Sequence, residues 1–320
     1  MIARRLRSSL AATSFLLLLA AGSNAGQRRV DVGSGGLAFG PQDQTLNLGD
    51  HVTWIWVGAG HNVENGVSLS DPNQGTIFNT AVGGSTAAFT WKADQTGTIP
   101  YFCAPHFNFG MTGSLMISSS GVSVSNFRIT EVQYDEASGH DRVEVANLGA
   151  DFGDLGRYRI SINGTTAVQV PLSSVIVLSG TGRVVVHTNQ GSAGSTQTDL
   201  FMGAIGDLPT AGSIALFAPN TISPSLTDPT QIVDFVQWGA GNQSNAATAV
   251  AAGIWPSVGE FVAQVPTPGP DGPYDLTLCG SESEQGAARW RVAHPNFGAQ
   301  SLCATPTQAT TWGRIKLLYR

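Results

Sequence analysis

The alternation of apolar and polar side chains along the chain predicts a protein built almost wholly of short β-strands. Helical spacing is convincing only in Asn245–Gly253, which is short and rich in alanine. Before residue 120, period-two strands are expected at Gln44–Leu48, Val52–Val57, Ala88–Trp91, Ile99–Cys103 and Ser114–Ile117. Such strands, separated by turn residues, are typical of β-sandwiches and barrels.

A Ser-rich stretch ending at Gly121 separates this series from a second one. We therefore expect two β domains, over 26–120 and 124–305, joined by a linker at 121–123 and followed by a tail at 306–320. The second series of strands is expected at Val124–Tyr134, Arg142–Ala146, Tyr158–Ile162, Ala167–Val170, Ser174–Leu178, Arg183–His187, Ser213–Phe217 and Ile232–Trp238.

Residues 1–25 have the pattern of a signal peptide. Three arginines between positions 4 and 7 precede an apolar run that is short for a membrane span, and Ser23-Asn24-Ala25 is a small-x-small cleavage site. We expect an exported protein, located in the periplasm, at the cell surface or in the medium, with the export route left open. Asp and Glu total 22 against 16 for Lys and Arg, which argues against nucleic acid or an anionic membrane as partner.

The segment YFCAPHFNFGMTG, residues 101–113, places Cys103, His106 and Met111 close together. The chain has three cysteines, and an oxidising compartment favours a disulfide between Cys279 and Cys303. Cys103 then stays unpaired, which in an exported protein suggests a metal or an intermolecular partner.

Thiolate, imidazole and thioether together favour a soft or borderline metal ion. Two histidines and a cysteine with a weak axial methionine form a blue-copper electron-transfer site. His61, in VGAGHNVENG just past a predicted strand, is the best candidate for the second imidazole. His51 begins that strand and is expected at the surface, and the remaining histidines lie in the second domain. The predicted copper ligands are His61, Cys103, His106 and Met111.

Residues 30–120 resemble a cupredoxin of the plastocyanin and halocyanin branch, through LGDHVTWIWVGAGHNV and GTIPYFCAPHFNFGMTGSLMI. The resemblance implies a Greek-key β-sandwich with one type 1 copper ion at one end, held by the four ligands named above. Asn62 resembles the asparagine that ties the two ligand loops together in this family. Phe107 and Phe109 would lie in an apolar patch where a redox partner docks, or alternatively in the core. The chain departs from the family at the Gly-rich segment 58–60.

Residues 124–303 resemble a lamin-tail domain, an immunoglobulin-like sandwich, through SNFRITEVQYDEASGHDRVEVANLG, DLGRYRIS, PLSSVIVLSG and QIVDFVQWG. That resemblance implies no catalytic residues, and Trp238 on an alternating strand is expected in the core. Met116 is expected to pack. Glu64 and Asp71 either lie near the metal site or, as is commoner for such acids, are solvated loop charges.

The motifs of hydrolases, metalloproteases and nucleotide-binding enzymes do not occur in the sequence, nor does a second His-x-His series. We therefore expect an electron carrier rather than an enzyme, with protein redox partners of unknown identity. Two other functions stay open: a protein that buffers or delivers copper, and a surface structural or adhesion protein in which copper is incidental.

Overall fold

The computed structural model describes residues 25–84, 87–121, 125–134, 141–164, 168–169, 177–178, 182–188, 194–196, 198–203, 207–265, 273–279 and 285–299. The predicted signal peptide, apart from Ala25, the C-terminal tail and Cys303 lie outside these residues. Of the described helices, none is long and apolar enough to cross a membrane.

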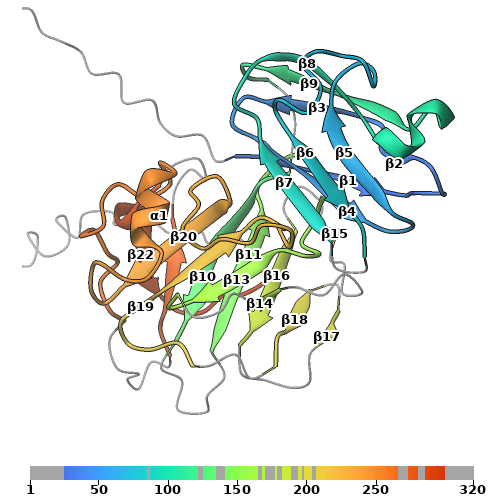
Figure 1. The fold of residues 1–320 in the computed structure, drawn as a ribbon. Coiled ribbons are helices and arrows are strands. Elements are labelled where there is room, and N and C mark those ends of the chain that lie inside the picture. The colour runs from blue at the N-terminus through green and yellow to red at the C-terminus, as the bar shows by residue number, and fades with distance from the viewer. Residues whose placement is uncertain are drawn as a thin grey trace, which may run out of the picture.

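The N-terminal part contains two sheets that enclose one core (Figure 1). One sheet has the order β2-β1-β4-β7 and the other β3-β9-β8-β5-β6, so four of the seven pairs of neighbouring strands are not consecutive in sequence. The strands are β1 (Gln27–Val32), β2 (Phe39–Gly40), β3 (Asp43–Asn47), β4 (His51–Trp56), β5 (His61–Asn65), β6 (Asn79–Val82), β7 (Ala88–Lys92), β8 (Gly97–Phe102) and β9 (Thr112–Ser118).

Alternation along each strand places one set of side chains in this core. In β9 the buried residues are Gly113, Leu115 and Ile117, and a period of two then directs Met116 outward. Met116 is 45% exposed, so the prediction that it packs is wrong. Trp54 lies at the centre of the core, with its ring 5.0 Å from that of Phe78 and 5.5 Å from that of Tyr101.

The C-terminal part contains a seven-stranded sheet, a four-stranded sheet and a two-stranded sheet, none of which shares a strand with the N-terminal sheets. The larger two have the orders β17-β18-β16-β11-β10-β21-β22 and β14-β13-β19-β20. Their bounds are β10 (Phe127–Gln133), β11 (Arg142–Asn147), β13 (Arg159–Ile162), β14 (Val168–Gln169), β16 (Arg183–His187), β17 (Gly194–Ser195), β18 (Asp199–Phe201), β19 (Gly212–Phe217), β20 (Ile232–Trp238), β21 (Asp275–Leu278) and β22 (Trp290–Ala293).

A second hydrophobic core draws on both of these sheets. Trp238 is fully buried there, as expected, and its indole Nε1 donates to the carbonyl of Pro209 at 2.9 Å. The helix α1 (Ala246–Ala251) falls within the segment expected to be helical. The remaining elements are the two-stranded sheet of β12 (Gly153–Asp154) and β15 (Val177–Leu178), and the 3-10 turn η3 (Ala287–Arg289). The fold is therefore all-β with few helices.

The loop between β19 and β20 contacts the first sheet of the N-terminal part, on the side where Figure 1 shows β4 and β7 next to the C-terminal sheets. Thr221 donates its N–H to the carbonyl of Ala88 at 2.9 Å and accepts from the Ala88 N–H at 2.8 Å through Oγ1. Thr90 donates to the carbonyl of Pro219. At β1, Arg28 forms an ion pair with Asp151 at 2.7 Å.

His51 belongs to this contact and not to the surface. Its side chain is 0% exposed, because the chain around Thr230 covers the start of β4. Nε2 lies 2.7 Å from the carbonyl oxygen of Thr230, while Nδ1 is buried with no hydrogen-bond partner. The prediction of an exposed histidine fails because the covering segment lies far away in the sequence.

Candidate metal centre

The first candidate ligand, His61, is the first residue of β5, the strand next to β8 in the second sheet. The sequence predicts only that it follows a strand at a turn, and the structure adds that a new strand begins with it. Two glycines allow separate stretches of the chain to approach each other closely beside His61: Gly33, at φ +88°, packs against Gly58. A Cβ built on Gly33 would lie 2.1 Å from the Gly58 oxygen and 3.0 Å from His61 Nε2.

The other two candidates stand at the end of β8. Cys103 follows this strand directly and is fully buried, and the 3-10 turn η1 (Ala104–Phe109) begins after it. Pro105 suits the first turn because its fixed φ matches helical backbone and its missing N–H is not needed. The His106 N–H donates to the Cys103 carbonyl at 3.0 Å, which places both side chains on one side of the turn. Gly110, in the left-handed region, ends it.

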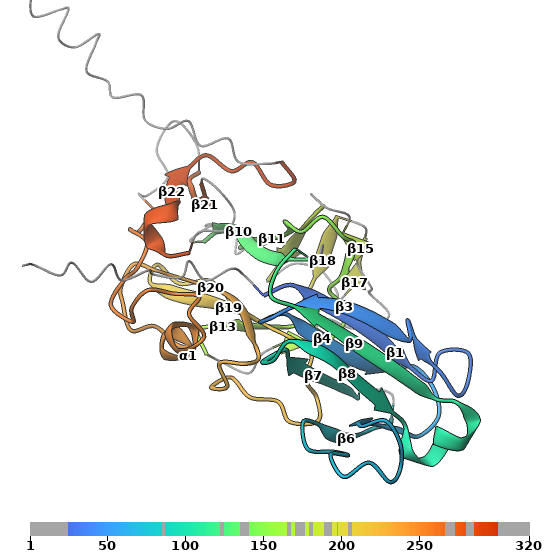
Figure 2. The ribbon, with the colours of Figure 1, turned by 90° about the horizontal axis from the view of Figure 1, so that it is seen from above.

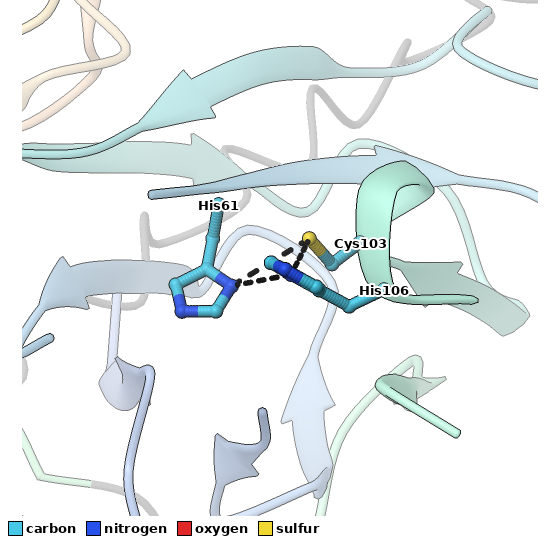
Figure 3. Close-up of side chains that lie close together, drawn as sticks. All are labelled: His61, Cys103 and His106. Atoms are coloured by element: carbon cyan, nitrogen blue, oxygen red, sulfur yellow. Dashed lines mark hydrogen bonds between the residues drawn. The ribbon is translucent and has the colours of Figure 1, made fainter. Parts of the chain in front are cut away.

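These three side chains point toward one another (Figure 3). His61 Nδ1 lies 3.0 Å from His106 Nδ1, and Cys103 Sγ lies 3.7 Å from the former and 3.3 Å from the latter. Their ligand atoms all lie within 4.8 Å of one another. In the described part of the chain, this is the one group of three or more His, Cys, Asp or Glu side chains close enough to hold a metal ion.

Met111 follows the turn and is 1% exposed. Its carbonyl accepts from the Cys103 N–H at 3.0 Å, and its own N–H donates to the His106 carbonyl at 3.3 Å. The backbone of Met111 is therefore tied to both Cys103 and His106. Its role as an axial ligand stays a prediction.

The electrostatic setting favours a neutral imidazole at His61 and the protonated form of the Cys103 thiol as long as no metal is bound. Burial, followed by the nearby His106, lowers the pKa of His61. Burial raises the pKa of the Cys103 thiol, while hydrogen bonds from the backbone of Asn62 and His106 act in the opposite direction. His61 Nε2 faces the carbonyl of Gly58 without a well-formed hydrogen bond. Two imidazole nitrogens and one sulfur are donors that fit copper.

Asn62 contacts the Cys103 segment twice. Its Oδ1 accepts from the Ala104 N–H at 2.6 Å, and its own backbone N–H points at Cys103 Sγ from 3.5 Å. The strand that begins at His61 is thus attached to the turn that contains His106. Asn62 also donates to Glu64, a buried side chain that the sequence suggests is a solvated loop charge; that expectation is wrong.

The two phenylalanines of the turn differ in exposure. Phe109 is 73% exposed. Phe107 is half-buried, and its ring packs edge-on against Phe102 at 5.1 Å between centroids. Figure 2 shows this turn at the end of the N-terminal part that lies away from the C-terminal sheets.

The two described histidines of the C-terminal part, His187 and His294, do not join the group. His187 Nε2 lies 2.8 Å from Asp199 Oδ1, and the His294 ring stacks on Tyr274. His140 lies outside the described residues. Cys279 is buried, but since Cys303 is also outside them, the disulfide stays a prediction.

The site thus combines the donor set of a copper protein with a two-sheet β-sandwich. Residues 27–118 match the family described as copper binding proteins, plastocyanin/azurin family. Chloroplastic plastocyanin of Tetradesmus obliquus is 31% identical over 103 residues, which cover 31% of this chain and 71% of that protein. Halocyanin of Natronomonas pharaonis is 33% identical over 88 residues, covering 27% of this chain and 51% of that protein.

The chain belongs to the plastocyanin/azurin family through its N-terminal part, and proteins of this family bind a copper ion. Among solved structures, oxidized plastocyanin of Dryopteris crassirhizoma is 26% identical, with a TM-score of 0.25; the match covers 28% of this chain and 100% of that one. The family match ends at residue 118 and includes nothing of the C-terminal part.

Proposed function

We propose that this protein is an exported blue-copper protein that carries single electrons between protein redox partners. The ligands proposed are His61, Cys103, His106 and Met111. The observation that carries the proposal is the convergence of two imidazole nitrogens and one sulfur within 4.8 Å, in a chain of the plastocyanin/azurin family. Copper, when bound, supplies a centre whose charge changes by one.

The chain contributes rigidity at the site. His61 is fixed by its strand, while Cys103 and His106 share one short turn that is hydrogen-bonded to Met111 and to Asn62. Donors held in this way move little when the charge of a bound ion changes, and a small reorganisation favours fast electron transfer. The buried setting also excludes water from Cys103, which protects the sulfur from oxidation.

The exposed Phe109 lies on the same turn as His106. An exposed apolar side chain beside a half-buried candidate ligand supports docking of a partner protein at this end. Phe107 contributes less surface, because its ring packs on Phe102.

We further propose that residues 124–305 form a lamin-tail-like, immunoglobulin-like sandwich that serves docking or surface association, with 121–123 as a linker. Two sheets around one core support this proposal. The ion pair of Arg28 with Asp151 and the hydrogen bond from Ala88 to Thr221 hold this part against the copper-binding part.

The test is the optical spectrum of the copper-loaded full chain. We expect an intense blue band in the oxidised protein, and its loss in Cys103→Ser, because the band requires a copper–thiolate bond. Met111→Leu should shift the band or the reduction potential. Met116→Leu is its matched control, since that side chain is exposed on β9, and it should change neither. A blue band that survives in Cys103→Ser would refute the ligand assignment.

A further inference from the structure

Glu64 is a buried acid next to the candidate metal centre that the proposed ligand set does not use. It lies in β5, 5% exposed, with Phe102 opposite it on β8 and Asn79 opposite it on β6. Phe102 immediately precedes Cys103, so the register places Glu64 beside the chain that enters the copper loop. Burial of an acid is costly unless its oxygens are hydrogen-bonded.

Both oxygens of Glu64 accept hydrogen bonds from amide groups. Asn62 Nδ2 donates to Oε2 at 3.1 Å, and Asn79 Nδ2 donates to Oε1 at 2.9 Å. Two accepting oxygens are the pattern of an ionised carboxylate. None of the ion pairs between described residues includes Glu64, so two neutral amides hold this negative charge.

The covering loop closes over this group. Gly75, at φ +68°, lies so near that a Cβ there would be 3.1 Å from Glu64 Oε1 and 3.1 Å from Asn79 Nδ2. A residue with a side chain would be both strained and crowded at this position. The carboxylate is thus kept from solvent, where its field is screened less than that of a surface acid.

Glu64 also determines which way the Asn62 amide faces. The Ala104 N–H requires the oxygen of Asn62, so the Nδ2 group must find an acceptor on its other side. Glu64 Oε2 is that acceptor. A continuous chain of hydrogen bonds therefore leads from Asn79 through Glu64 and Asn62 to the residue after Cys103.

We propose that Glu64 is a positioning residue that lowers the reduction potential of the copper site, by holding Asn62 against the Cys103 loop and by placing a fixed negative charge behind it. This inference rests on the proposed function. A buried negative charge stabilises the more positive oxidised ion relative to the reduced one. Removing it favours the reduced state.

The experiment compares reduction potentials of the copper-loaded full chain by voltammetry. Glu64→Gln should keep a blue band and have a higher potential, by about tenfold in the equilibrium between the oxidation states, or about 59 mV for one electron. Glu64→Asp keeps the negative charge and should have a reduction potential close to that of the wild type. Asp94→Asn, which removes an exposed acid, is the matched control and should leave the potential unchanged.

A second variant reaches the same carboxylate from outside. Asn79 is exposed, so Asn79→Lys can pair with Glu64 without altering β5, and it should also raise the potential. Equal potentials in the wild type, Glu64→Gln and Asn79→Lys, all of them blue, would overturn the role of Glu64 alone. A wild-type protein with no blue band would overturn the proposed copper site instead, so the two failures are distinguishable.

Discussion

Acidification should weaken the fold through His51, the buried histidine at the contact between the two parts of the chain. Burial lowers the pKa of His51 to about 4 from the ordinary value of 6.5. The carbonyl of Thr230 and the carboxylate of Asp228 act to raise it, and Lys92, opposite His51 on β7, acts to lower it. In the unfolded chain the same imidazole takes a proton near pH 6.5.

The sign and size follow from proton linkage. Between pH 6.5 and about 4 the unfolded chain binds a proton that the folded chain refuses, so stability falls as the pH falls through this window. One pKa unit corresponds to 1.36 kcal/mol, so the free energy of unfolding should drop by about 3 kcal/mol on reaching pH 4. Above pH 6.5 the neutral ring contributes no such dependence.

The assay is urea unfolding of the copper-free full chain at several pH values, for the wild type and His51→Gln. The glutamine amide can still donate to the Thr230 carbonyl but does not titrate in this window. Every other titrating group, His61 included, is common to both proteins, so the difference between the two curves reports His51 alone. Parallel curves from pH 7.5 to 4 would refute the reasoning.

Two further predictions concern other sites. Gly33→Ala should lower the free energy of unfolding by about 2–5 kcal/mol and disturb the copper spectrum, because its Cβ would collide with the Gly58 oxygen and touch His61 in a left-handed backbone. Gly58→Ala, whose added Cβ has its nearest contact at 3.5 Å, should change neither the unfolding free energy nor the optical spectrum. Burial, together with the neighbouring Asp275, raises the pKa of the Glu131 carboxyl to about 9, so the free energy of unfolding should fall as the pH rises from about 4.5 toward 9. Glu131→Gln should flatten this dependence in urea unfolding. Equal slopes of unfolding free energy against pH in the wild type and Glu131→Gln would contradict this prediction.

The donor group was the most predictable part of the molecule, because its chemistry is local. A thiol, an imidazole and a thioether between residues 103 and 111 limit the metal before any fold is known. The structure brings three of the four predicted ligands, His61, Cys103 and His106, to one point. Alternation also gave most strands of the N-terminal part, since one face of each must be buried.

Strands with a weak apolar pattern were missed. β5 has the sequence HNVEN and contains a single apolar residue, yet four of its five residues are buried, since the strand lies inside the sheet. Polar residues in such a strand are buried through hydrogen bonds with particular partners, and no periodicity reveals this. Glu64 was therefore expected in solvent. Eight other strands were missed as well: β1, β2, β6, β12, β17, β18, β21 and β22.

His51 shows the other limit of a sequence pattern. Its neighbours on β4 predict a strand, which is confirmed, but the segment that covers it comes from the loop before β20. Contacts between residues so far apart in sequence have no local signature. Met116 is an opposite case, since the alternation with Leu115 and Ile117 already excluded it from the core.

The contact of Thr221 with β7 has a consequence for any attempt to isolate the copper-binding part. β7 forms the border of its sheet and pairs with β4 on one side only. On the open side, the Ala88 N–H and carbonyl are bonded to Thr221. A fragment ending near residue 121 would leave these backbone groups without hydrogen-bond partners at an exposed edge strand. Such an edge can pair with the same strand of another copy. Self-association of such a fragment would then reflect the missing cover and not a property of the native protein.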